Sequence, residues 1–358
     1  MFFSRSGSGV AAWRRHACGL SRPSLLRAPA CAHRLCTKSE AGDGAKLPSL
    51  PPFLDESLRG IGQVVFCNDP RSGAVMLAAL LYGDAWLGAM GALGTVSATA
   101  AARACRLDGG MISNGLAGYN GCLVGCAFSV FLGAAPWSPS TALATIAAAA
   151  VSAPLAAALK PACGSVPQWT LAFNFATLSV LAAVRPLAGA APADAAASIG
   201  ALEWLCAPLV GVSQIFVVND PIAGAALLGA IGLYSPLCAA HTLLGSSVGV
   251  ATGLALGAPA TEIGMGLWGF NPALTALAMS VFFVPSSQAV ALGTGGAAVT
   301  AVAFGGAKAA MGGAFGVPAL TLPFCAVASG CYLLHHGVPG LVLAAAPHSP
   351  EKNAAPPP

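Results

Sequence analysis

The chain has 358 residues, of which 56% are hydrophobic and only 8% are charged, and its mean hydropathy is +0.76. Soluble globular domains carry about 25% charged residues, so this composition excludes an ordinary soluble protein. The abundant Ala and Gly suit close helix packing in lipid, and we expect an all-α polytopic membrane protein. The formal net charge of +4 is concentrated at the N-terminus, because residues 1–39 hold seven Arg and Lys and no acid.

Residues 1–46 form a basic leader that we expect to be disordered. Its first part contains Arg and Ser but no acidic residue, which is typical of an organellar transit peptide. The alternative is a basic tail that the positive-inside rule holds on the cytoplasmic side. A secretory signal is excluded, because no apolar stretch of signal-peptide length follows the charges. The leader therefore leaves an organellar (mitochondrial) membrane open as the location.

The first apolar segment follows the Pro-rich residues 40–56 and is short. Residues 58–67 are apolar, but a helix needs about 20 residues to cross a bilayer. Such a segment is tolerated at membrane depth when it is re-entrant and is buried in protein or lines a cavity. Asp69 is suited to cap a new helix and Pro70 to begin it. The sequence therefore predicts a break here, followed by a helix that runs through Leu81.

The rest of this half contains spans and one further break. Glycines at 115, 118 and 121 would each cost about 1 kcal/mol inside a helix, which indicates a break where the backbone closely approaches another group. The expected elements are a span over 86–104, a polar connection at 108–113, a re-entrant piece and span from 115 to 132, spans over 142–159 and 169–184, and a linker at 185–200.

An internal duplication organises the chain. The stretch Gln63 to Pro70 recurs 151 positions later as Gln214 to Pro221, and Gly73 and Gly94 recur at the same offset. We expect two membrane repeats, 47–200 and 201–346, and a disordered tail at 347–358. Each homologous half would have about five transmembrane helices plus two re-entrant half-helices, and this odd number of spans predicts that the halves are inverted. The second half would span 237–256, 266–284, 289–304 and 319–334, whereas the apolar piece 338–346 has no counterpart.

Uncharged polar side chains are the candidate pore residues. Acidic residues lie at caps and connections rather than inside the spans, whereas ion-coupled carriers need ionisable groups at depth. We therefore expect passive conduction of an uncharged solute. Glutamine and threonine both donate and accept hydrogen bonds, and they occur as the repeated pairs Gln63 with Gln214 and Thr170 with Thr321. Each Gln could instead bond a neighbouring helix, and each Thr its own helix, but the duplication favours a pore role.

Apolar side chains near these pairs could form flat walls. They are Phe66, Tyr119, Leu123, Val217, Phe270 and Leu274. A slot with planar walls and polar ends suits a planar amide, whereas an ion would lose its hydration there without a counter-charge. Taken singly, the rings could be ordinary packing residues. Six further repeated residues are expected to be structural helix caps: Asn68, Asp69, Pro70, Asn219, Asp220 and Pro221.

Neither metal nor enzyme chemistry is expected. The twelve cysteines include no Cys-x2-Cys and no zinc spacing, and most lie singly in apolar runs, where Cys behaves as a small hydrophobe. An intramembrane enzyme would need an activated nucleophile or a metal set, and no Ser, Cys or acid is placed with a His inside a span. We expect no catalytic residue, metal, cofactor or nucleic-acid partner.

These motifs together resemble the urea transporter family, the facilitative urea channels. The resemblance rests on Gln-x-x-Phe-x-Asn-Asp-Pro-x-x-Gly at 63–73, Gly-Leu-x-Gly-Tyr-Asn-Gly at 115–121, Gly-Leu-Trp-Gly-Phe-Asn at 266–271, and Pro-x-x-Thr-Leu-x-Phe at 167–173 and 318–324. It covers about residues 58–334. It implies a homotrimer in the plasma membrane, ten spans and one pore per subunit, with a selectivity filter in which ladders of oxygen atoms accept the urea N–H groups. The two polar pairs would then belong to the filter and the six apolar residues to its slot.

Some positions differ from the family's pattern. Tyr119 carries a hydroxyl where an apolar ring would be expected, Val217 stands opposite Phe66, and Ala172 occupies the position of Pro323. These differences keep a second hypothesis open, a channel for another small neutral solute such as ammonia, water or a short-chain amide. Ammonia channels usually need paired pore histidines, and no two histidines here are matched by the repeat.

Overall fold

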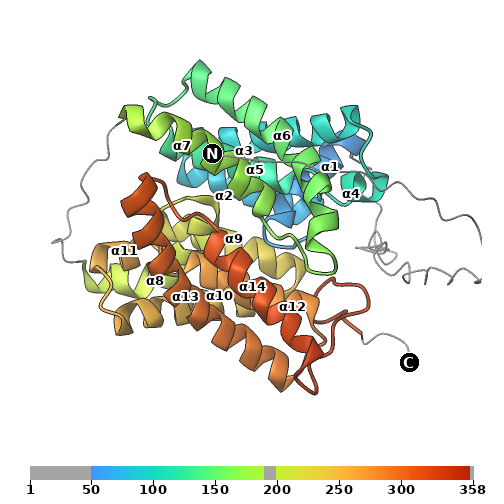
Figure 1. Cartoon of the computed structure of the whole chain (residues 1–358), viewed down its shortest axis with the longest axis vertical. Coiled ribbons are helices and arrows are strands. Elements are labelled where there is room, and N and C mark those ends of the chain that lie inside the picture. The colour runs from blue at the N-terminus through green and yellow to red at the C-terminus, as the bar shows by residue number, and fades with distance from the viewer. Residues whose placement is uncertain (1–49, 189–198, 355–358) are drawn as a thin grey trace, which may run out of the picture. The chain divides into compact units, whose positions relative to one another are not determined.

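The computed structural model of the protein describes residues 50–188 and 199–354, with only the backbone at 185–188. The predicted leader, most of the predicted linker and residues 355–358 lie outside the described residues. The described parts of the chain consist of helices and their connections (Figure 1). One isolated β-bridge in these parts joins Phe283 to Leu343. The prediction of an all-α polytopic membrane fold is confirmed.

Within residues 50–188 and 199–354, each half contains seven α-helices in the same order. Those of the first half are α1 (Pro52–Gln63), α2 (Pro70–Gly83), α3 (Ala85–Ala104), α4 (Gly109–Ser113), α5 (Tyr119–Phe131), α6 (Pro139–Cys163) and α7 (Leu171–Ala188). Those of the second are α8 (Ala201–Ser213), α9 (Pro221–Tyr234), α10 (Pro236–Ala255), α11 (Ala260–Gly264), α12 (Phe270–Phe282), α13 (Ser287–Phe315) and α14 (Leu322–Leu333). Short 3₁₀ turns follow α8 (η1, Gln214–Phe216) and α14 (η2, Leu334–His336).

The duplication read from the sequence is also present in the helices. The helices α2 to α5 and α9 to α12 begin and end at residues that are 151 positions apart. Helices of the two halves also pack directly on each other, since α2 contacts α9 and α7 contacts α14. Which way each half is inserted in the membrane stays a prediction.

Matched caps start the helices that follow the two breaks. Asp69 Oδ1 accepts a hydrogen bond from the backbone N–H of Arg71 at 2.7 Å, and Pro70 is the first residue of α2. Asp220 Oδ1 accepts from the N–H of Ala223 at 2.6 Å, and Pro221 begins α9. A carboxylate at this position satisfies an N–H that has no partner within the helix, and a proline at the first position lacks only an N–H that would be unused.

In the part of the chain that the structure describes, four helices are long and apolar enough to cross a membrane: α3, α6, α10 and α13. The segment 201–216 and α9 together would make a fifth, but the pair is bent by 74° at the break between them. Three shorter apolar stretches, α5, 171–184 of α7, and α12, have 10 to 17 residues. The expected total of ten spans, and the re-entrant course of the short helices, stay predictions.

Glycines allow the short helices α5 and α12 to lie against the long ones. A Cβ added at Gly94 of α3 would come 2.0 Å from the carbonyl oxygen of Gly121 in α5. At the matched position in the second half, a Cβ on Gly245 of α10 would come 2.6 Å from the carbonyl oxygen of Pro272 in α12. Because such distances leave no room for a side chain, glycine is required at both crossings, and the crossings fix the helices that carry the site.

The C-terminal residues return to the helical body. The N–H of Val284 donates to the carbonyl of Val342 at 2.8 Å, so part of the apolar piece 338–346 pairs with the end of α12. Within the predicted tail, Glu351 accepts hydrogen bonds from the hydroxyl of Ser235 at 2.7 Å and from the N–H of Leu237 at 3.0 Å. Asn353 Nδ2 donates to the carbonyl of Val281 at 2.7 Å. Residues 348–353 thus connect the α9–α10 corner to the end of α12 through specific contacts. The composition of the tail did not indicate that it would pack against the helices.

Candidate functional site

The centre of the candidate site is a direct contact between the two predicted threonines. Thr170 Oγ1 and Thr321 Oγ1 are 2.7 Å apart, and both residues are buried. They lie immediately before α7 and α14, at positions matched by the repeat. Two hydroxyls share one hydrogen in such a bond, so one hydroxyl hydrogen of the pair remains for a third group. The structure therefore brings these predicted residues together, although the sequence had not indicated that they bond each other.

Asn174 completes this centre and was missed from the sequence. Its Nδ2 donates to Thr321 Oγ1 at 2.9 Å, and its Oδ1 accepts from the N–H of Thr321 at 3.2 Å. Cys325 Sγ lies 3.2 Å from Thr170 Oγ1. Asn174 and Cys325 occupy matched positions, so the two halves supply different side chains to the same cluster. Because the repeat does not preserve this residue type, the duplicated sequence pattern does not indicate Asn174 as a site residue.

Two matched asparagines hold the ends of the site helices. Asn120 Oδ1 accepts from the N–H of Phe173 at 3.1 Å, and Asn271 Oδ1 accepts from the N–H of Phe324 at 3.2 Å. Each bond satisfies an N–H in the first turn of a helix, where no partner exists within the helix itself. The sequence offered a signal for them, since both lie in the duplicated Gly-x-Asn motif, but only the ring beside each asparagine was predicted as a site residue.

Left-handed residues accompany the predicted polar positions in both halves. Phe66 and Val217 have φ values of 60° and 65°, and Trp169 and Leu320 have 51° and 47°. Bulky and β-branched residues rarely adopt positive φ, and each such residue costs about 1–3 kcal/mol. Phe66 and Val217 follow Gln63 and Gln214 by three residues, and Trp169 and Leu320 directly precede the two threonines. This matched strain marks the four chain breaks that carry the predicted polar side chains.

The predicted ring residues belong to two aromatic clusters. The ring of Phe66 packs edge-on against Trp169 and against Phe282 of α12, with centroids 6.3 Å and 5.9 Å apart. The hydroxyl of Tyr119 donates to the carbonyl of Trp169 at 2.5 Å. Phe270 packs edge-on against Phe304 of α13 at 5.7 Å. Trp169 is thus a central residue of the first cluster that the sequence analysis missed, since its left-handed backbone has no sequence signal.

The remaining predicted wall residues are apolar and close to these helices. Leu123 of α5 and Leu274 of α12 are both fully buried, and Val217 is partly buried against the core. A cavity of about 540 Å³ lies elsewhere, between α13 and α14, and none of the residues that line it is a predicted site residue. That cavity is apolar and open, and it does not contain the polar centre.

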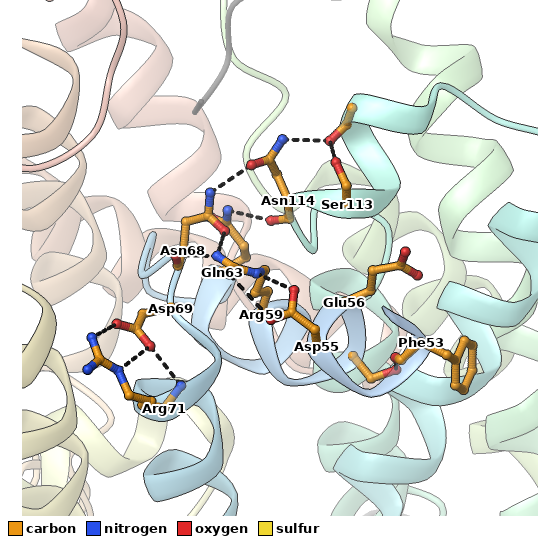
Figure 2. Close-up of polar contacts among 12 residues, drawn as sticks. Phe53, Asp55, Glu56, Arg59, Gln63, Asn68, Asp69, Arg71, Ser113 and Asn114 are labelled. Carbon is orange, nitrogen blue, oxygen red and sulfur yellow. Dashed lines mark hydrogen bonds and ion pairs between the residues drawn. The ribbon is translucent and has the colours of Figure 1, made fainter. Parts of the chain in front are cut away.

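The two glutamines are equally buried but differently bonded. Gln63 and Gln214 each expose 8% of their surface. Gln63 Nε2 donates to the backbone carbonyl of Asn114 at 2.8 Å. Figure 2 shows this bond together with the polar residues around it on α1 and α4. At the position matched to Asn114 the second half has Met265, so the surroundings of Gln214 are chemically different.

The surroundings of the polar centre are electrically neutral. Among residues 50–184 and 199–354, the one charged side chain that is buried is Glu56, and Arg103 pairs with it at 2.8 Å. The other ion pairs in this part of the chain join Arg59 to Asp55, Arg71 to Asp69 and Lys308 to Glu262. A neutral polar centre among apolar helices can replace the water around an uncharged solute, whereas it offers an ion no counter-charge.

Helices broken at matched positions, with uncharged polar groups from both halves at the breaks, define a membrane protein of the transporter or channel class. The protein-family profile described as "Urea transporter" matches residues 54–336. Urea transporter 1 of sheep (Ovis aries) and of rat (Rattus norvegicus) are both similar to this chain, with 34% identity over 295 residues, which cover 78% of this chain and 76% of each relative. The chain belongs to the urea transporter family.

Proposed function

We propose that the protein conducts urea passively across a membrane. The observation that carries the proposal is the bonded pair Thr170 and Thr321, a buried and uncharged polar centre made from both halves. Membership of the urea transporter family supports urea as the solute. Urea is planar and neutral, and it carries N–H groups and a carbonyl oxygen that need partners when its water is removed.

The proposed mechanism is a stepwise exchange of hydrogen bonds. The carbonyl oxygens of the Gln63 and Gln214 side chains accept urea N–H groups, and the threonine pair offers its remaining hydroxyl hydrogen to the urea oxygen. Phe66, Tyr119, Leu123, Val217, Phe270 and Leu274 form the flat walls of the slot. Passage is driven by the urea gradient alone, because no titratable group takes part.

The same proposal includes the assembly and the membrane. We expect a homotrimer with one conduit per subunit, two oppositely inserted halves in each subunit, and the two repeats 47–200 and 201–346 as its domains. Resemblance to the family favours the plasma membrane, whereas the Arg-rich leader favours an organellar membrane. Imaging the full chain with a fluorescent protein attached, and repeating this after deletion of residues 1–46, separates the two locations.

The test is urea flux in proteoliposomes followed by stopped-flow light scattering. Wild type is compared with Gln63→Ala combined with Gln214→Ala, and Gln288→Ala is the matched control because Gln288 is exposed on α13. Loss of two hydrogen-bonding groups in an apolar slot is expected to reduce urea flux by about ten-fold or more, with the oligomer unchanged on gel filtration. Wild-type flux no higher than that of protein-free vesicles would overturn the proposal.

Solute choice is tested in the same assay with urea, acetamide and glycerol. A flat slot should pass urea fastest and glycerol slowest, because glycerol is neither planar nor rich in N–H groups. Equal rates for the three solutes would contradict a urea channel and would indicate an unselective pore for small neutral solutes.

A further inference from the structure

The surroundings of the two glutamines differ in a way that the duplication does not predict. In the first half, Asp55, Arg59, Asn68 and Asn114 form a polar chain beside Gln63. The residues at the matched positions are Cys206, Val210, Asn219 and Met265, of which three are apolar. The glutamine itself is present in both halves, as Gln63 and Gln214, but only Gln63 has mainly polar residues at these neighbouring positions. This difference between the halves indicates that the polar chain has a role specific to Gln63.

The polar chain runs from the partly buried ion pair of Arg59 and Asp55 to the buried glutamine (Figure 2). Arg59 Nε donates to Asp55 at 2.7 Å, and Arg59 Nη1 donates to the carbonyl and to the side-chain oxygen of Asn68, at 2.8 Å and 3.0 Å. Asn68 Nδ2 then donates to Asn114 Oδ1 at 2.9 Å. Asp55, Arg59 and Gln63 are spaced by four residues on α1, so they share one face of that helix.

Asn114 is held on both sides by this chain. Its Oδ1 accepts from Asn68, while its Nδ2 donates to the carbonyl of Gly110 at 2.8 Å in the preceding turn of α4. Both the oxygen and the nitrogen of its side-chain amide are therefore bonded, which fixes the position of the backbone carbonyl that faces Gln63. Asn114 is buried, so exchange of these bonds with water is disfavoured.

The carbonyl of Asn114 decides which way the Gln63 amide faces. Gln63 Nε2 donates to that carbonyl at 2.8 Å. If the amide turned over, its oxygen would face another oxygen and the N–H bond would be lost, which is costly for buried groups. One N–H of Gln63 is thereby occupied and its nitrogen is turned toward Asn114, so its side-chain oxygen is left on the side available to a solute. Gln214 has Met265 in the matched position, which offers no side-chain link of the kind that Asn114 makes to Asn68.

We propose that Asn114 is a positioning residue that keeps the Gln63 amide with its oxygen toward the solute, so that this end of the conduit favours molecules rich in N–H groups. This inference rests on the proposed urea conduction. Without Asn114, the carbonyl shifts, the Gln63 amide turns freely, and its N–H groups compete with its oxygen for the solute. Urea, with four N–H bonds, then loses more than formamide, which has two.

The test compares urea and formamide flux in proteoliposomes, with the flux of protein-free vesicles subtracted for each solute. Asn114→Met installs the residue of the matched position, and Met265→Ala is the control at that position in the other half. We expect Asn114→Met to lower urea flux about five-fold and formamide flux less than two-fold, since one hydrogen bond to the solute is affected. Met265→Ala should leave the ratio of the two fluxes unchanged.

A second variant covers the case in which Asn114→Met does not fold. Asn68→Ala removes the link between Arg59 and Asn114 but keeps Asn114 itself, and it should lower the urea-to-formamide ratio in the same direction by about two-fold. An unchanged ratio in a folded variant, with both solutes slowed equally, would overturn the positioning role. Absence of wild-type urea flux would instead overturn the proposed function, so the two failures are distinguishable.

Discussion

Two threonine hydroxyls that meet from different halves of a chain form an unusual kind of polar centre. Thr170 and Thr321 bond each other, and Asn174 donates to Thr321 from one turn into α7. The arrangement fixes two oxygen atoms, and the bond between them uses one of the two hydroxyl hydrogens, while Cys325 Sγ lies 3.2 Å from Thr170 Oγ1. A solute that needs an N–H acceptor and an O–H donor at one point finds both here.

We predict that Thr321→Val lowers urea flux about ten-fold and also reduces thermal stability. Valine has the shape of threonine but removes the hydroxyl that bonds Thr170 Oγ1 and accepts one of the hydrogen bonds of Asn174 Nδ2. A buried polar group that loses a partner costs about 1–3 kcal/mol. Flux is measured in proteoliposomes and stability by thermal unfolding in detergent.

The control for this substitution lies in the same helix as Asn174. Thr177 is fully buried, and its hydroxyl has no hydrogen-bond partner among the residues that the structure describes. Thr177→Val therefore removes a polar group that gains nothing from folding, and it should leave flux unchanged and stability equal or higher. If both variants behave alike, the threonine centre has no special role.

At the residue scale, the sequence predicted the groups that the repeat preserves and missed those that it does not. Thr170 and Thr321 could be found because they are duplicated, but their mutual bond could not, since sequence spacing gives no distance between separate helices. Asn174 was hidden because its counterpart is a cysteine. Trp169 could not be predicted, because the left-handed backbone conformation of a tryptophan depends on tertiary packing. In this structure the packing consists of contacts with neighbouring aromatic rings and of a hydrogen bond from Trp169 Nε1–H to Ser329 at 2.9 Å.

At the scale of helices, the crossing of α3 and α5 depends on contact between backbones. Gly94→Ala would place a methyl group 2.0 Å from a backbone oxygen, which a side-chain movement cannot relieve. We expect a loss of stability of about 1–3 kcal/mol, seen as an earlier melting transition in detergent. Gly229→Ala is the control, because Gly229 lies in α9 with no atom within 4 Å of the added Cβ, and it should be neutral or stabilising. Equal melting of the two variants would contradict tight packing at this crossing.

Helix positions were predictable where local signals and the apolar pattern agreed. The predicted helix from Asp69–Pro70 and the span over 86–104 correspond closely to α2 and α3, because a capping carboxylate, a proline and an uninterrupted apolar run mark their ends. The length of α13 was underestimated, since the expected 289–304 is 287–315 in the structure. The additional residues 305–315 include Lys308, which pairs with Glu262 of α11.

The docked C-terminal residues should respond to pH. The ring of His348 stacks on Tyr234 at 5.1 Å, and its Nδ1 lies 2.9 Å from the Tyr234 hydroxyl. Burial lowers the pKa of His348 below 6.5, Lys352 adds to this effect, and Glu351 opposes it. Burial would raise the pKa of Glu351, but its hydrogen bonds from Ser235 and Leu237 outweigh burial and lower it.

The sign of this dependence follows from proton binding. Between the lowered pKa of His348 and 6.5, the detached segment binds more protons than the docked one, so docking weakens as pH falls through 6.5 and is fully present above it. We predict that carboxypeptidase removes the C-terminal residues faster at pH 5.5 than at pH 7.5. His348→Gln should abolish the difference, and a difference that persists in that variant would rule out the histidine as its cause.

For the molecule as a whole, the open question is the direction of the two halves in the membrane. Seven helices in each half repeat in order, and an odd number of spans in the first half would insert the second from the opposite side. Cys105 and Leu256 are matched positions, each at the end of a long helix, and both are exposed. They report on the two orientations directly.

We predict that these positions react from opposite sides of a sealed vesicle. An impermeant thiol reagent is applied to vesicles in which all molecules have the same orientation. The reaction of Cys105 is measured as the labelling that is lost in Cys105→Ser. The reaction at position 256 is measured as the labelling that is gained in Leu256→Cys. With inverted halves, only one of the two reacts until the vesicles are opened. Reaction of both from the same side would show parallel halves.

The contacts of residues 348–353 have a practical consequence for handling the protein. Asn353 donates a hydrogen bond to the carbonyl of Val281 at 2.7 Å. An affinity handle or fluorescent reporter inserted directly after Asn353 would strain this contact, so a long flexible spacer should precede it. A protein truncated before Glu351 lacks these contacts at the α9–α10 corner, so its melting temperature would underestimate the stability of the native protein.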